Sequence, residues 1–121
     1  MKDFREIQVW QKAHQLVLDI YRIICLFPND EKYGLISQIK RAAVSIPTNI
    51  AEGCGRNSDP DFARFLEIAY GSANEVDYLL HLSKDLSILE DRSYQTINEK
   101  LTEVKKMLAS LIRKIRSDKK Q

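Results

Sequence analysis

The 121-residue chain has few of the residues that loop-rich, disulfide-bonded or membrane-spanning proteins need. Four glycines and three prolines are too few for an all-β or loop-rich architecture. The two cysteines, Cys25 and Cys54, form no CxxC pair, so we expect buried, reduced thiols in a cytoplasmic protein. Charged Asp19 and Arg22 interrupt the most apolar run, residues 16–27, and no apolar signal segment opens the chain. The sequence therefore predicts neither a membrane span nor a secretory leader.

Histidine is equally scarce, which limits the chemistry available to the chain. Neither His14 nor His81 follows a glutamate by three positions, as a di-iron bundle requires, and no zinc spacing or Gly-rich phosphate loop is present. Helical-bundle RNases of one type place an arginine five positions before a histidine, where this chain has Val9 and Val76. A nucleophile beside a histidine is a spatial arrangement that the linear sequence neither shows nor excludes. We expect no metal, cofactor or catalysis, and we expect His14 to be hydrogen-bonded in the core or a subunit interface.

Helical periodicity, by contrast, runs through most of the chain. Apolar residues spaced three and four apart predict four amphipathic helices, which suit a soluble, well-folded composition of 44% hydrophobic and 30% charged residues. The fourth helix has a strict heptad seam, formed by Tyr94, Ile97, Leu101, Val104, Leu108, Leu111 and Ile115. Short connections between long helices favour antiparallel neighbours. The predicted helices cover about residues 4–26, 31–54, 60–86 and 91–116, and a basic tail follows at 117–121.

The predicted helices have more apolar surface than one bundle core requires. The first helix carries two apolar stripes, one containing Trp10 and the other Leu16. Met107 and Ile112 lie off the heptad seam of the fourth helix. Because a monomer would leave such surface in water, the pattern predicts contacts between subunits, with Trp10 packed in the core or at an interface.

Pro47 lies in the middle of the second predicted helix, where a proline removes one backbone hydrogen bond and costs about 3 kcal/mol. We expect a bend at this position. Ser45, Thr48 and Asn49 flank the proline and can supply hydrogen-bonding groups around the break. Gly53 follows soon after and is predicted to end the helix.

The segment around Pro47 also resembles a known family, the four-helix-bundle proteins encoded in intervening sequences of bacterial 23S rRNA genes. The resemblance runs in order from residue 4 to about residue 86. It rests on residues 41–47 and 49–53, on Val9-Trp10 with Ala13, on Phe27-Pro28, on Phe62, Arg64, Phe65 and Leu66, and on Ala69, Gly71-Ser72-Ala73 and Glu75. It implies a homopentamer with no known catalysis. It also implies kinship with an accessory protein of diversity-generating retroelements, which binds a reverse transcriptase and nucleic acid.

Charged residues of this motif favour a structural network over a contact patch. Glu52 and Glu75 lie near the apolar faces of their predicted helices, and Arg41 and Arg64 are their natural partners. The alternative is a patch for RNA or protein made by Arg41, Arg56 and Arg64. Gly71 is predicted to allow another backbone to approach closely, because a mid-helix glycine otherwise costs about 1 kcal/mol.

The charge of the chain is unevenly distributed. Residues 105–121 contain seven basic residues and one acidic residue, although the whole chain has a net charge of only +2. Such a basic arm is an electrostatic footprint of nucleic-acid binding, although it also suits the negative end of a helix dipole. The candidate phosphate-contacting residues are Arg56, Lys105, Lys106, Arg113, Lys114 and Arg116.

The sequence as a whole predicts a single all-α domain over residues 1–121, an antiparallel up-down-up-down four-helix bundle that assembles. The leading hypothesis is a cytoplasmic bacterial protein that binds rRNA or other nucleic acid without strong sequence readout. The alternative is a scaffold that presents identical surfaces to a larger partner such as a reverse transcriptase. A small helical enzyme would need convergent polar residues inside the bundle, where this chain places mostly apolar ones.

Overall fold

The computed structural model describes residues 2–118, and within this range the side chains of all residues except 31–33 and 118. The described chain is helical throughout and contains no strand. The long helices are α1 (Gln8–Ile24), α2 (Ser37–Cys54), α3 (Asp59–Asp85) and α4 (Asp91–Asp118). A short 3₁₀ turn, η1 (Phe4–Glu6), precedes α1, and two further turns, η2 (Asn29–Glu31) and η3 (Lys32–Ile36), precede α2.

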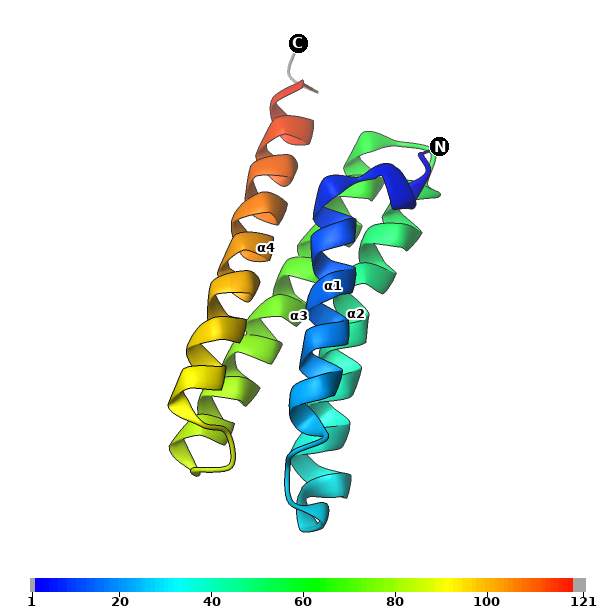
Figure 1. Cartoon of the computed structure of the whole chain (residues 1–121). Coiled ribbons are helices and arrows are strands. Elements are labelled where there is room, and N and C mark those ends of the chain that lie inside the picture. Colours follow the sequence, from blue (N-terminus) through cyan, green and yellow to red (C-terminus); the bar gives the residue numbers. More distant parts are fainter. Residues whose placement is uncertain (1, 119–121) are drawn as a thin grey trace.

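The four helices lie side by side, and their connections lie at alternate ends of the bundle (Figure 1). Each helix packs against its neighbours in the chain, and α4 packs back against α1, with the most extensive contact between α2 and α3. The apolar stripe of α3 and the predicted heptad seam of α4 provide much of the core. Its largest fully buried side chains are Leu16, Ile20, Ile39, Ile46, Ile50, Leu66, Leu80, Ile97, Leu101, Leu108, Val76 and Val104.

The ends of α3 follow from local hydrogen bonding. The Ser58 hydroxyl accepts a hydrogen bond from the backbone N–H of Asp61, and Pro60 occupies the first turn, where its missing donor costs nothing. At the other end, Ser87 adopts the left-handed conformation with φ of 62°. The N–H groups of Ser87 and Ile88 donate to the carbonyls of Lys84 and Ser83, which forms a Schellman cap without the usual glycine.

The start of α1 differs from the prediction. Ile7 is extended, with φ of −84° and ψ of 122°, so α1 begins at Gln8 and residues 4–6 form a separate turn. The Asp3 carboxylate caps this turn by accepting from the backbone N–H of Arg5 at 3.0 Å. The N–H of Lys2 also donates to the carbonyl of Cys54, which ties this segment to the end of α2.

The two apolar stripes of α1 have different environments. The core face contains Val9, Ala13, Leu16, Ile20 and Ile24, all of which are buried. The stripe through Trp10 and His14 lies at the edge of the core: His14 is exposed, and Trp10 is half-buried against the core and against Phe4, at 4.8 Å between ring centroids. Both stripes have helical spacing, so periodicity could not decide which of them becomes the core face.

Helix α2 continues through Pro47 as an α-helix, and polar side chains gather beside the proline as predicted. Thr48 Oγ1 donates to the Val44 carbonyl at 2.7 Å, and Asn49 Nδ2 donates to the Ser45 carbonyl at 2.8 Å and to Ser45 Oγ at 2.9 Å. Ser45 Oγ shares a hydrogen bond of 2.7 Å with Ser72 Oγ of α3. The polar groups around the proline therefore also connect two helices.

Candidate nucleic-acid interface

The candidate phosphate-contacting residues of α4 form two groups, according to whether they already pair with a carboxylate. Lys105 and Arg116 face α3, where Lys105 Nζ lies 3.0 Å from Asp77 Oδ2 and Arg116 forms an ion pair with Glu67. The two pairs are about three turns apart along each helix, so they attach the second half of α4 to α3. Both side chains already have a carboxylate partner, which makes them weaker phosphate ligands than the sequence suggested.

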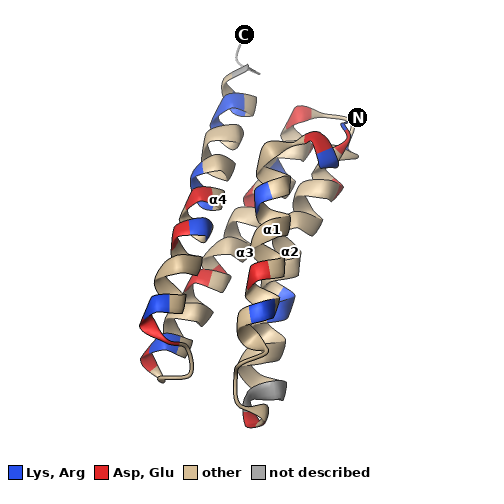
Figure 2. Cartoon of the chain, in the orientation of Figure 1, with Lys and Arg blue, Asp and Glu red and all other residues tan. Residues whose placement is uncertain are grey.

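The other three candidate residues of α4 are exposed and form what we call the α4 basic strip: Lys106, Arg113 and Lys114. None of the three forms an ion pair with any side chain that the structure describes. Figure 2 shows blue segments along the second half of this helix. The strip is the part of the predicted arm that is free to contact a polyanion.

Two shallow apolar grooves border the α4 basic strip. On one side, Lys106 and Lys114 lie at the rim of a groove of about 430 Å³ between α1 and α4, whose apolar lining includes Ile7 and Leu111. On the other side, Arg113 lines a groove between α3 and α4 that also contains Tyr70. The basic side chains of the strip therefore border apolar surface as well as solvent.

Arg56 lies apart from the strip, in the loop between α2 and α3. Its guanidinium carbon is 4.6 Å from the centroid of the Phe65 ring, and Arg64 lies at the same distance from this ring. The loop and the end of α4 are at the same end of the bundle (Figure 1). Arg56 is exposed, so its stacked guanidinium keeps donors that can reach a phosphate.

The predicted network of Arg41, Glu52, Arg64 and Glu75 is wrong for the single chain. All four side chains are exposed on the outward faces of α2 and α3. Arg64 forms an ion pair with Asp61 at 3.1 Å. The other three form none with the described side chains. The buried faces of α2 and α3 are largely apolar, and the motif charges lie on the exposed faces of these helices.

The prediction for Gly71 is also wrong within the chain, and the close approach occurs at Gly53. A Cβ atom added at Gly71 would have no other atom within 4 Å, and the residue is exposed. A Cβ atom at Gly53 would come within 2.9 Å of Phe62 Cδ1 and of Phe65 Cβ. Gly53 therefore lets the end of α2 lie against α3, which the sequence suggested only as a helix stop.

Two predictions of burial need correction. Cys25 is exposed, because it follows the last residue of α1 where the chain leaves the core. Cys54 is buried as expected, and burial raises the pKa of its thiol. His14 is exposed and stacks on Trp10, with ring centroids 5.0 Å apart, so it belongs to the outward stripe of α1 and not to the core.

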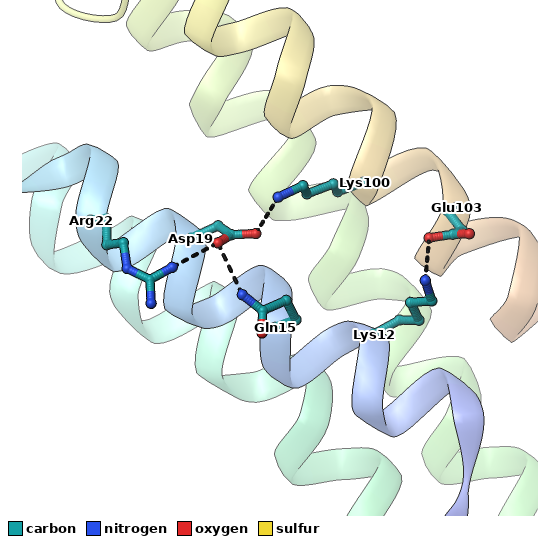
Figure 3. A network of polar contacts seen from close by, with 6 residues as sticks. All are labelled: Lys12, Gln15, Asp19, Arg22, Lys100 and Glu103. Carbon is teal, nitrogen blue, oxygen red and sulfur yellow. Dashed lines mark hydrogen bonds and ion pairs between the residues drawn. The ribbon is translucent and has the colours of Figure 1, made fainter.

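An ion-pair network between α1 and α4 was not among the predictions from the sequence (Figure 3). The Asp19 carboxylate accepts from Lys100 at 2.6 Å, from Arg22 at 3.0 Å and from Gln15 at 3.1 Å. Burial acts to raise the pKa of Asp19, but the hydrogen bonds from Lys100 and Gln15 and the nearby positive charges outweigh it and hold the pKa below 3.8. The i, i+3 and i, i+4 spacing of Asp19, Arg22 and Gln15 could have indicated their contacts within α1. The contact with Lys100 could not be predicted, because only the fold brings α4 beside α1.

Within the described part of the chain, no three histidine, cysteine or carboxylate side chains cluster closely enough to hold a metal ion. No described helix combines the length and apolar character that crossing a bilayer requires.

Comparison with known proteins gives a consistent family assignment. Residues 5–110 match the family model of the 23S rRNA-intervening sequence protein. A solved structure from Bacteroides thetaiotaomicron VPI-5482, described as a protein with unknown function from the S23 ribosomal protein family, is 30% identical. The similarity covers 86% of this chain and 97% of that one, with a TM-score of 0.77. No curated protein matches the chain.

Proposed function

Because this chain belongs to the family of 23S rRNA-intervening sequence proteins, we propose that it is a non-catalytic bundle protein that binds RNA through α4. In this proposal it acts in the bacterial cytoplasm as an antiparallel up-down-up-down bundle that self-associates. The number of copies, five, is implied by the family resemblance. The leading partner is rRNA or another structured RNA.

The observation that carries the proposal is the α4 basic strip. Lys106, Arg113 and Lys114 are exposed and lack carboxylate partners among the described side chains, so an approaching phosphate does not have to displace one. Arg56 adds a further positive charge at the same end of the bundle. Assembly strengthens the argument, because each copy adds an identical strip and makes binding multivalent.

Binding through these residues is expected to depend on phosphates more than on base sequence. The strip presents lysine and arginine side chains on a helix surface, and it contains no aromatic side chain on which a base could stack. Affinity should therefore fall steeply with salt, by about 0.7–0.9 log units per phosphate contact for each log unit of salt concentration.

The test is a fluorescence-anisotropy titration of nuclease-treated protein against a structured rRNA fragment, repeated across salt concentrations. The double variant Arg113→Glu with Lys114→Glu should bind at least about tenfold more weakly at low salt and show a smaller salt slope. The control variant Lys40→Glu with Arg92→Glu changes the charge equally and lies outside the strip, so it should keep most of the affinity. Equal losses in both variants would contradict a specific role of the strip.

A protein scaffold is the second candidate, and exposed apolar side chains favour it. Leu26, Tyr78 and Leu86 are 83%, 62% and 55% exposed. Leu26 and Leu86 lie in connections at the end of the bundle opposite the α4 C-terminus (Figure 1). If the wild-type protein does not bind RNA at low salt, the scaffold becomes the leading hypothesis. A partner that docks on this end should then tolerate Arg113→Glu with Lys114→Glu.

A further inference from the structure

The four motif charges form no ion pairs with one another inside the chain, and they have matching positions on two helices. Arg64 pairs only with Asp61 of its own helix. On α2, Arg41 precedes Glu52 by 11 residues, and on α3, Arg64 precedes Glu75 by 11 residues. Eleven residues make about three turns and about 16 Å of α-helix, so both charges of each helix lie on one face. All four side chains are exposed, and those faces point away from the core of the chain.

The residues between these charges are also complementary in shape. Val44 lies on the outward face of α2 and is 40% exposed, and Ile68 lies on the outward face of α3 and is 42% exposed. Gly71 occupies the same face of α3 and leaves open space where a Cβ atom would be. A groove that contains Val44, Pro47 and half-buried Trp10 runs along this side of α2.

We propose that the outward face of α2 binds the outward face of α3 of a second copy, with the two helices antiparallel. Arg41 then lies opposite Glu75 of the second copy, and Glu52 lies opposite Arg64 of the second copy. Val44 fits over Gly71 of that copy, where the missing side chain leaves room. The inference rests on the proposed self-association and adds to it the two faces, their direction and their register.

The positions of the charges indicate which molecule binds to this face and in which direction its helix runs. An antiparallel arrangement pairs opposite charges at both ends of the contact, whereas a parallel arrangement would place Arg41 against Arg64 and Glu52 against Glu75. Within one chain α2 and α3 already pack in nearly this register, with Ser45 opposite Ser72, yet the four charges form no ion pairs with one another there. A second copy of this chain offers the same matched spacing, which makes it the proposed occupant. Because the two faces differ, each copy can bind two neighbours, which is the contact type that produces closed rings.

The test is sedimentation velocity on the full-length wild type and on charge variants at the same micromolar concentration. Arg41→Glu and Glu75→Arg should each weaken self-association by roughly tenfold or more, because each places like charges together. The double variant Arg41→Glu with Glu75→Arg should restore the wild-type mass. Arg92→Glu and Glu99→Arg, exposed on α4, are the matched controls and should leave the mass unchanged. Circular dichroism of every variant should show the wild-type helix content.

Each outcome has a defined meaning. Single variants that keep the wild-type mass would overturn the interface and leave self-association intact. A double variant that stays dissociated while fully helical would overturn the register. A monomeric wild type would overturn the assembly together with this interface, whereas the RNA titration would still decide the proposed nucleic-acid function.

Discussion

Individual glycines have opposite roles in this bundle, and only their surroundings distinguish them. Gly53 is buried where α2 approaches Phe62 and Phe65, so it is required by packing. Gly71 is exposed on α3 and has open space around it. Helix propensity alone treats the two residues alike, since either would cost about 1 kcal/mol relative to alanine inside a helix.

Gly53→Ala should destabilise the protein by about 1–3 kcal/mol, because the new methyl group would overlap two phenylalanine side chains of α3. Urea unfolding followed by circular dichroism measures the change. Gly55→Ala is the control, because its Cβ atom would meet only the Glu52 carbonyl at an ordinary 3.5 Å. Similar losses in both variants would contradict the packing explanation.

Ser87→Gly should stabilise the protein by about 0.5–1 kcal/mol, because glycine adopts the left-handed φ of 62° without the strain of a Cβ atom. Part of the strain relief is offset by the greater freedom of glycine in the unfolded chain. Thermal unfolding should show a higher Tm than the wild type. Ser87→Ala keeps the Cβ atom and should not show this gain, and a gain in both variants would point to the lost hydroxyl instead.

At the scale of elements, α4 is held to the bundle on two sides by ion pairs of different quality. Asp19 joins α1 to Lys100 of α4 and is only 13% exposed, while Lys12 and Glu103 form a more exposed pair at 3.6 Å. On the other side, Lys105 and Arg116 reach carboxylates of α3. The partly buried Asp19 network is expected to contribute most, since exposed pairs are screened by water and salt.

Asp19→Asn should destabilise the protein by about 1 kcal/mol at pH 7, because the amide loses the charge that Lys100 and Arg22 bind. The folded pKa of Asp19 lies below the ordinary 3.8, so its contribution is present above that pH and is lost as pH falls through the folded value. Urea unfolding of both proteins between pH 7 and pH 2.5 should show the difference shrinking below about pH 4. A constant difference would contradict an ionic origin.

Glu103→Gln is the matched control for this pH series. Its side chain is 52% exposed, so we expect a change below about 0.5 kcal/mol.

At the scale of the whole molecule, the exposed charges of α2 and α3 and the open space at Gly71 are explained by the proposed assembly and not by the packing of one chain. Arg41, Glu52 and Glu75 have no ion-pair partner among the described side chains, and the space at Gly71 is open. Arg64 pairs only with Asp61 of its own helix. Lys106 and Lys114 of the α4 basic strip border the groove between α1 and α4, away from the proposed contact, whereas Arg113 shares its groove with Gly71 and would lie beside the neighbouring copy.

Gly71→Ala separates subunit stability from assembly. In the dissociated Arg41→Glu background it should raise the free energy of unfolding by about 1 kcal/mol, because alanine favours the helix and meets no neighbouring atom. In the wild-type background it should weaken self-association, because the methyl group fills the space proposed for Val44 of the neighbour. Unfolding and sedimentation experiments give the two readouts, and unchanged association would remove Gly71 from the interface.

The sequence by itself determined the helices, because periodic apolar residues and local caps act over a few positions. The four amphipathic helices, the heptad seam of α4 and the polar groups beside Pro47 were all readable in this way. The family resemblance, carried by the motif around Pro47, is confirmed by the family model over residues 5–110.

The tertiary structure decided which faces meet and which charges find partners. Helix packing determines which apolar stripe of α1 is buried and places the close helix contact at Gly53, not at Gly71. The same packing leaves Arg41 and Glu75 exposed on the surface. It also divided the basic residues of α4, because Asp77 and Glu67 come from a different helix. The physical reason is that burial and ion pairing depend on the orientation of whole helices, which sequence spacing describes only relative to each helix's own axis.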